Sequence, residues 1–270
     1  MKKTIAIIVL LVCGTMSLMA QEKVSFKAGL RVGANFSTLY GVESDGQIIP
    51  TIFSAAEKYK MKPGVRAGLV FDIGLTPKVS IQPAIYYSWQ RWGSEGQCYA
   101  TFNQQDTFIM RTKEVMNMQL VQIPVLVNFR LKFKNNEKNA FVFGVGPYFS
   151  VALAGQDAME GTLIDQNNEA NYWKIRGKAN FYKDEKSSLY KTEQDDFVTE
   201  YPTGFYNHPF RRCDFGFSVA VGFELKKFYI GAGADFGVIN TANVNEWERV
   251  GIREYSQRNL NLQVNLGYYF

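Results

Sequence analysis

Residues 213–238 alternate large apolar side chains with small ones over two consecutive runs, and this alternation limits the possible folds more than any other feature. Every odd position from 215 to 225 is Phe, Val or Leu, and every even position from 228 to 238 is Phe, Ile, Ala or Val. A period of two indicates β-strands, and the short connection at Lys226 and Lys227 predicts a hairpin. The positions between are mostly Gly, Ala and Ser, which favour the crowded interior of a narrow closed barrel. A soluble β-sandwich that buries the apolar face is the alternative.

The N-terminus has the pattern of a secretory signal peptide. Lys2 and Lys3 precede an apolar run over residues 5–12, and small residues lead to Ala20. The run is too short to span a membrane as a helix, so we expect cleavage after Ala20. Residues 1–20 are then the signal peptide, and residues 21–270 form a single barrel domain.

The net charge and hydropathy of the chain exclude several classes of protein. Cleavage removes two Lys and lowers the formal net charge from +5 to +3, which argues against a nucleic-acid partner. The mean hydropathy is −0.17 although 15% of the residues are aromatic. Membrane β-barrels combine these properties, because every second residue of each strand faces inward.

Eight segments of the mature chain share the two-residue period. They are residues 26–36, 64–74, 79–90, 116–133, 140–153, 213–225, 228–238 and 259–270. Long connections (37–62, 91–115, 154–212 and 239–256) alternate with short turns. The even count and this asymmetry predict an all-β fold, an eight-stranded antiparallel up-and-down transmembrane barrel with short periplasmic turns and long extracellular loops.

Three local features refine this prediction. A short helix is expected at residues 52–59 inside the first long connection. The alternation slips near Leu120 and Val121, which predicts a β-bulge, and Pro83 marks a second candidate bulge. Outward aromatic residues near the strand ends predict two interfacial girdles. The periplasmic girdle is Phe26, Phe129, Phe228, Tyr268 and Phe270, and the outer girdle is Phe36, Tyr87, Trp89, Phe215 and Phe236.

Charged residues on the inward faces predict a lumenal network. Its members are Arg31, Arg66, Asp72, Arg130, Asp214, Glu224 and Asp235. Unpaired buried charges are costly, so we expect Arg130 to pair with Asp72 and Glu224 near the periplasmic end. Toward the outer end, Arg66 is expected to pair with Asp214 and Asp235. These clusters would plug the barrel and have a structural role rather than a role in transport.

The sequence contains no convincing catalytic constellation. The single histidine, His208, lies in the long segment 154–212 with Asp195 and Asp196, and a solvated loop histidine is the simpler interpretation of it. We expect no enzymatic activity, no cofactor and no metal site. Cys98 and Cys213 are a candidate disulfide in an exported protein, with two separate thiols as the alternative.

The segment 154–212 is rich in Tyr and charged residues, which favours a binding surface. A protein, a glycan or lipopolysaccharide is the expected ligand. The alternative is that these aromatic residues pack the loop onto the rim of the barrel.

Three motifs carry a resemblance to a known family: KAGLRVGANFS at residues 27–37, LVQIPVLVNF at residues 120–129 and DFGF at residues 214–217. They resemble the outer-membrane β-barrel family of Bacteroidetes that includes PorT-like proteins, often labelled the porin family. The resemblance covers nearly all of the mature chain. It implies a bacterial outer-membrane location, with lipid and lipopolysaccharide around the barrel. It also implies that Phe270 is the aromatic end presented to the outer-membrane assembly machinery.

The function expected from these observations is structural or interaction-based, with the extracellular loops as the working surface. Two alternatives stay open: a PorT-like accessory factor of protein secretion, and a small-solute channel.

Overall fold

The computed structural model describes residues 25–43, 54–102, 106–133, 136–164, 170–178, 191–192, 211–241 and 256–270. These residues form antiparallel strands, which are β1 (Ser25–Glu43), β2 (Ser54–Gly74), β3 (Val79–Phe102), β4 (Asp106–Phe133), β5 (Asn136–Ile164), β6 (Ala170–Lys178), β7 (Lys191–Thr192), β8 (Cys213–Leu225), β9 (Phe228–Gly237) and β10 (Ser256–Tyr269). Among them, no helix is long and apolar enough to cross a membrane.

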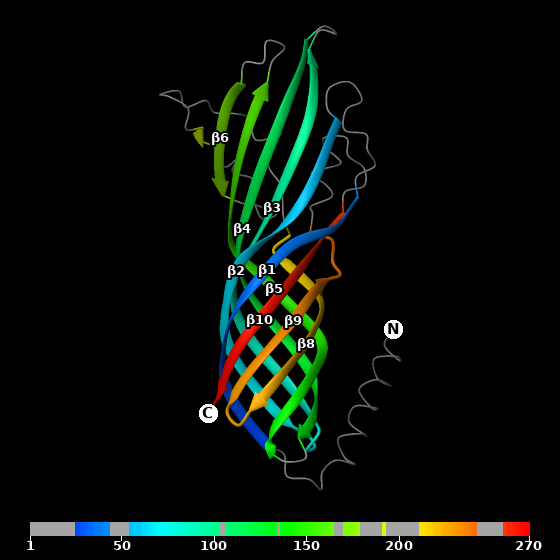
Figure 1. Ribbon diagram of the computed structural model, residues 1–270, viewed down its shortest axis with the longest axis vertical. Helices are drawn as coiled ribbons and strands as arrows, with labels where there is room; N and C mark the ends of the chain where they lie inside the picture. Colours follow the sequence, from blue (N-terminus) through cyan, green and yellow to red (C-terminus); the bar gives the residue numbers. More distant parts are fainter. Residues whose placement is uncertain are drawn as a thin grey trace.

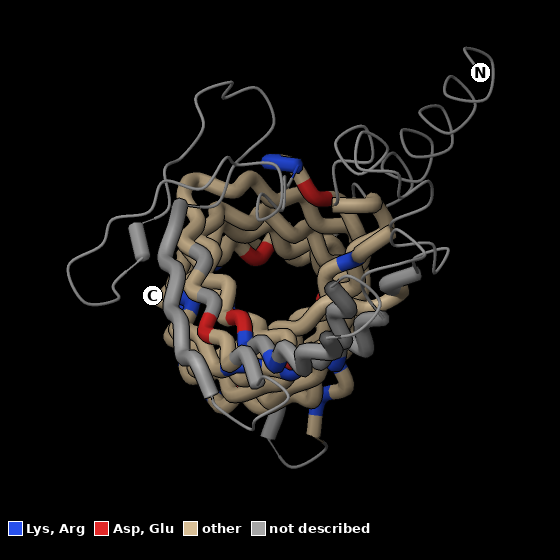
Figure 2. The backbone as a smooth tube through the Cα atoms, turned by 90° about the horizontal axis from the view of Figure 1, so that it is seen from above, with Lys and Arg blue, Asp and Glu red and all other residues tan. Residues whose placement is uncertain are grey.

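Eight of the strands close into a barrel in the order β1-β2-β3-β4-β5-β8-β9-β10, and β10 pairs with β1 to complete it. Figure 1 shows the barrel from the side, and Figure 2 shows the closed ring of backbone from above. The predicted eight-stranded antiparallel barrel is confirmed. The predicted hairpin of residues 213–238 forms β8 and β9, and Lys226 in its turn has a positive φ of 59°, as the first position of a type II′ turn requires.

The strands β2, β3, β4 and β5 continue past the barrel as a sheet to which β6 also pairs, and we call this sheet the extension (Figure 1). Pairing of β1 with β2 ends at Ser37 and Lys62, whereas β2 stays paired with β3 as far as Ser54. The strand β5 has two partners: its lower part pairs with β8, and its upper part, from Gln156 onward, pairs with β6. The strand therefore forks from the barrel into the extension.

The extension corrects several predicted loops. Residues 54–59 belong to β2, so the short helix expected at residues 52–59 is wrong for this part. Most of the predicted loop 91–115 is a continuation of β3 and β4. The predicted loop 154–212 contains the end of β5 together with β6 and β7. The polar residues of these segments suggested loops. The segments are strands without the apolar alternation of the barrel, because no side of the extension faces lipid.

A β-bulge does occur at the level of Leu120 and Val121, but it lies in β5 and not in β4. The pairing of β4 with β5 shifts register there, and the extra residue is Leu153 of β5. The strand β4 keeps its alternation, because Met116 and Met118 are buried on its inward face. Because these inward residues are apolar, the sequence looks as if the apolar alternation changed from one face of the strand to the other.

The bulge predicted at Pro83 is also misplaced. The pairs on either side of Pro83 keep one register with β2 and with β4. The register of β2 with β3 shifts instead between Lys62 and Val65, a segment that contains Pro63. Proline cannot donate a ladder hydrogen bond, so it is tolerated at such irregularities.

Apolar side chains point outward around the barrel, and every residue of the two predicted girdles is exposed. At the end that carries the C-terminus, the rings of Phe228 and Tyr268 meet edge to face with centroids 5.3 Å apart, and Phe270 contacts Tyr268 in the same way. An apolar exterior with aromatic ends suits a barrel surrounded by lipid.

Candidate functional site

The inward faces of the barrel strands carry the polar side chains, and the lowest layer is centred on Arg130 of β4. Its Nε and one terminal nitrogen donate to the two oxygens of Glu224 on β8, at 3.0 and 2.9 Å. The same terminal nitrogen lies 2.8 Å from Asp72 on β2. The Ser80 hydroxyl accepts a hydrogen bond from Arg130 and donates one to Asp72, both at 2.6 Å. Arg130 therefore contacts both carboxylates that the sequence analysis assigned to it.

A second layer holds two guanidinium groups against tyrosine rings. Arg31 lies 3.8 Å from the ring centroid of Tyr229 and donates to the hydroxyl of Tyr269 at 2.8 Å. Arg66 lies 3.7 Å from the ring centroid of Tyr86. Cations are attracted to the face of an aromatic ring, which stabilises these arginines without a carboxylate at hydrogen-bond distance.

Asp235 of β9 is the centre of the third layer, and it is 1% exposed. Its carboxylate accepts hydrogen bonds from Gln122, Ser218, Asn261 and Gln263, over 2.6 to 3.1 Å. Arg66 lies 3.7 Å away. Donors from β4, β8 and β10 thus converge on one buried carboxylate, which compensates for its desolvation.

Asp214 departs from the predicted pairing. Its carboxylate accepts a hydrogen bond from the hydroxyl of Tyr148 at 2.7 Å, and among the described residues no arginine pairs with it. The predicted outer cluster therefore divides into a pair of Arg66 with Asp235 and a separate pair of Asp214 with Tyr148.

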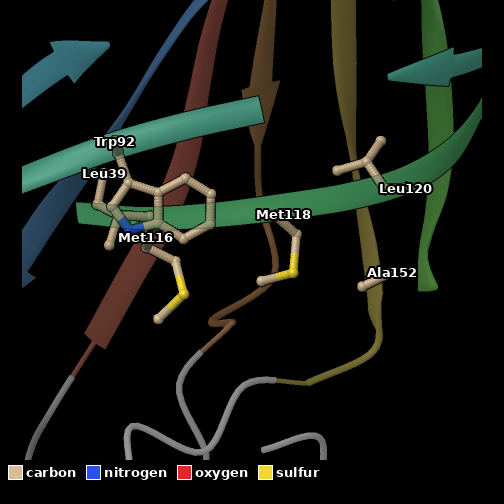
Figure 3. Packing of buried hydrophobic residues seen from close by; sticks show 6 residues of the cluster. All are labelled: Leu39, Trp92, Met116, Met118, Leu120 and Ala152. Carbon is tan, nitrogen blue, oxygen red and sulfur yellow. The ribbon is translucent and has the colours of Figure 1, made fainter. Parts of the chain in front are cut away.

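An apolar cluster lies inside the barrel at the end nearest the extension. Its buried members are Leu39, Trp92, Met116, Met118, Leu120 and Ala152 (Figure 3). This cluster was not predicted, because Leu39 and Trp92 were expected in loops and the alternation of β4 was expected to slip near Leu120. Uninterrupted counting by two from Gln122 back to Met116 would have found it.

Glycines make room for the large inward side chains. A β-carbon at Gly222 or Gly231 would overlap the hydroxyl of Tyr229. The small residues that first suggested a narrow barrel are thus the space into which tyrosines from neighbouring positions fit. Beside Arg31 and Arg66 a cavity of about 20 Å³ remains, which is room for about one water molecule.

The family follows from a comparison with protein-family models. Residues 19–243 match the model of the outer membrane protein beta-barrel domain. The chain belongs to this family. Membership of this family places the protein in the outer membrane, as the resemblance had implied. Comparison with curated protein sequences gives no match.

The solved structures that match the chain include three outer-membrane proteins. Ail, the attachment invasion locus protein of Yersinia pestis, solved with the heparin analogue sucrose octasulfate, is 9% identical over 91% of this chain and 99% of its own, with a TM-score of 0.34. Neisserial surface protein A is 10% identical over 92% and 100%, with a TM-score of 0.31. OprG from Pseudomonas aeruginosa is 9% identical over 90% and 96%, with a TM-score of 0.34. Likeness at this level carries no information about function.

Cys98 and Cys213, the two cysteines beyond the predicted signal peptide, are not brought together. The thiol of Cys213 is free and exposed. Backbone pairing sets Cys213 level with Val151, Val151 with Val121, and Val121 with Tyr87. Cys98, whose side chain lies outside the described part, is about eleven residues or roughly 36 Å farther along β3. A disulfide joins Cα atoms only about 5.5 Å apart, so the predicted bond does not form in this arrangement.

The remaining predicted residues lie at the ends of the outer-membrane barrel or outside the described residues. Phe270 is exposed at the end of the barrel that carries the short turns, and its backbone nitrogen donates to Ala28 at 2.9 Å. Its role as an assembly signal stays a prediction. His208, Asp195 and Asp196 lie outside the described residues.

Proposed function

We propose that the chain is a non-conducting outer-membrane barrel without enzymatic activity, which anchors a binding surface outside the cell. The single observation that supports a closed lumen is the set of side chains that bridge it. Asp235 on β9 accepts hydrogen bonds from β4, β8 and β10 and lies near Arg66 of β2. Arg130 joins β4 to β2 and β8 two layers below. Ions would have to break both layers to pass.

The width of the barrel also favours this function. Eight strands enclose an interior that side chains are able to fill. Here tyrosines, arginines and amides fill it, and the apolar cluster around Trp92 lies above them. A charged solute would meet an apolar barrier after the polar layers.

Single-channel conductance of the protein refolded into planar bilayers tests the closed lumen. We expect no conductance from the wild type, with heat-modifiable migration on a gel as the control for folding. A channel-forming outer-membrane barrel measured in the same bilayers shows that the assay detects an open pore. Steady, ion-selective conductance of the wild type would make the protein a channel and overturn the proposal.

The binding surface is the extension together with residues 154–212, and its proposed ligand is a protein or a glycan. Replacing residues 154–212 by a short turn between Leu153 and Cys213 should leave the barrel folded and abolish surface binding. Impaired protein secretion with surface binding intact would instead support the PorT-like role.

A further inference from the structure

Two arginines of the second lumenal layer carry unpaired donors in the interior of the barrel. Arg31 and Arg66 are 5% and 4% exposed. The Nε of Arg31 and the Nε and Nη1 of Arg66 have no hydrogen-bond partner among the described residues. Buried polar atoms in proteins are nearly always paired, with another protein atom, with water or with an ion. Three such donors on two side chains of one layer therefore indicate a ligand.

The strand register brings the two guanidinium groups into one layer. Arg31 of β1 is opposite Gly68, and Arg66 of β2 is opposite Gly33, so the two arginines are diagonal neighbours on adjacent strands. A tyrosine ring packs against each guanidinium, with its centroid 3.8 Å from Arg31 and 3.7 Å from Arg66. An arginine stacked on a ring keeps the donors at its edge free to bind an anion.

Both arginines line the cavity of about 20 Å³, which has an excess of one positive charge. Within the described part of the chain, Asp235 is the one carboxylate that lines it. This carboxylate accepts hydrogen bonds from four side chains and lies 3.7 Å from Nη1 of Arg66. The two carboxylates of the lowest layer bind Arg130 and do not line the cavity. One negative charge would therefore balance Arg31, Arg66 and Asp235 together.

The size of the cavity restricts the ligand to a very small anion. A volume of about 20 Å³ is room for about one water molecule, and a chloride ion is only slightly larger than water. Phosphate, sulfate and carboxylate ions are too large. A water molecule is the alternative ligand, and the unpaired Oδ1 of Asn265 in the cavity wall would accept its hydrogen bond. Water would leave the excess positive charge without compensation.

We propose that this cavity binds one chloride ion between Arg31 and Arg66. The ion accepts hydrogen bonds from the three unpaired donors and neutralises the layer. An ion that binds the folded barrel and not the unfolded chain stabilises the fold by mass action. The inference goes beyond the proposed anchoring function and does not rest on it, because a conducting barrel would keep the same donors and the same charge.

Anomalous diffraction tests the site directly. The full-length protein is refolded and crystallised in sodium bromide, because bromide replaces chloride and scatters anomalously at its absorption edge. We expect an anomalous peak within hydrogen-bond distance of both guanidinium groups. A water molecule in the cavity, with bromide peaks confined to the protein surface, would overturn the proposal.

Urea unfolding measures the effect of the ion on stability. Chloride replaces gluconate at constant ionic strength, since gluconate is too large for the cavity. At chloride concentrations above the Kd, each tenfold increase in chloride should raise the folding equilibrium constant of the wild type about tenfold. Equal folding constants in the two salts would contradict a bound chloride.

Two variants locate the chloride dependence. Arg66→Met removes one cation with its unpaired donors, and the chloride dependence should be lost. Lys27→Met is the matched control, because it removes the same charge from an exposed position near the end of β1, and the dependence should remain. A dependence that persists in Arg66→Met would assign the effect to another site. If Arg66→Met does not fold, the position of bromide in the wild type decides.

Discussion

Arg130 is the residue on which the lower part of the barrel interior depends. It contacts Asp72, Glu224 and Ser80, and its relative exposure is 8%. Removal of one member of such a cluster leaves the opposite charges buried and unpaired. Loss of the Arg130 side chain would therefore destabilise the protein mainly because it leaves buried carboxylates unpaired, and less because the ionic attraction itself is lost.

We expect Arg130→Ala to lower the free energy of unfolding by about 3–5 kcal/mol, measured by urea unfolding of the refolded protein. Lys132→Ala on the same strand, where the side chain is exposed, should change it little. Neutralising the partners as well, in Arg130→Met/Asp72→Asn/Glu224→Gln, should recover part of the loss. An unchanged unfolding free energy for Arg130→Ala would contradict the closed lower layer.

Glu95 in the extension gives a prediction about pH. The hydrogen bond from Lys60 lowers the pKa of the Glu95 carboxyl below its ordinary 4.5, and the charges of Lys113 and Lys62 act in the same direction. Because the folded-state pKa is depressed, the contribution of this pair is complete above pH 4.5 and is lost as the pH falls through the folded value.

Titration by NMR should show a lower pKa for Glu95 in the wild type than in Lys60→Gln. Lys58→Gln is the matched control, because Lys58 is opposite Glu95 in the register but is not its hydrogen-bond partner. An equal pKa in the wild type and Lys60→Gln would refute the pairing.

The site was only partly predictable at this scale. Strict alternation placed all seven charged residues of the predicted network on the inward face, and all are buried. The pairing of Asp214 with Tyr148 was not predictable, because partners across a lumen depend on the register of distant strands. The convergence of amides on Asp235 was hidden for the same reason.

At the scale of elements, the hairpin of β3 and β4 has two separate parts. As far as the pair of Trp92 and Met116 it belongs to the barrel, and beyond this pair it belongs to the extension. The strands in the barrel were predictable, since lipid on one side imposes an apolar period of two. The extension was not, since its two faces are both polar in sequence, and such strands resemble loops.

The two parts should be separable. Replacing residues 95–113 by Asn-Gly joins Ser94 to Glu114, which are already opposite each other, through a favoured hairpin turn. We expect the shortened protein to keep its heat-modifiable migration, because the barrel pairs stay intact.

The matched deletion replaces residues 221–232 by Asn-Gly between Ala220 and Gly233, which are also paired. It shortens the barrel itself and should abolish folding. Loss of the folded band in the first deletion would show that the barrel needs the extension.

For the whole molecule, an apolar band between two aromatic girdles fixes the depth of each residue in the membrane. The energetic effect of a charge on the outward face should therefore follow position along a strand. The energetic effect of a charge on the inward face should not depend on membrane depth in this way, because inward residues contact other side chains rather than lipid.

We expect Val125→Arg, near the middle of the band on β4, to lower the free energy of unfolding in lipid vesicles by about 2–4 kcal/mol. Phe133→Arg on the same face, at the end of the strand, should cost about 0–1 kcal/mol. Equal effects of the two substitutions in urea unfolding would contradict the assigned membrane band.

The fork in β5 has a consequence for how such a chain diversifies. The residues that close the barrel, Asn139 to Val151 against β8, are set before the strand enters the extension. The segment between Ile164 and Arg211 can become longer or shorter without moving that pairing. The entropic cost of closing a loop rises only slowly with the length of the loop. Descendants of one ancestor could therefore exchange the outer segment freely while inheriting the same anchor.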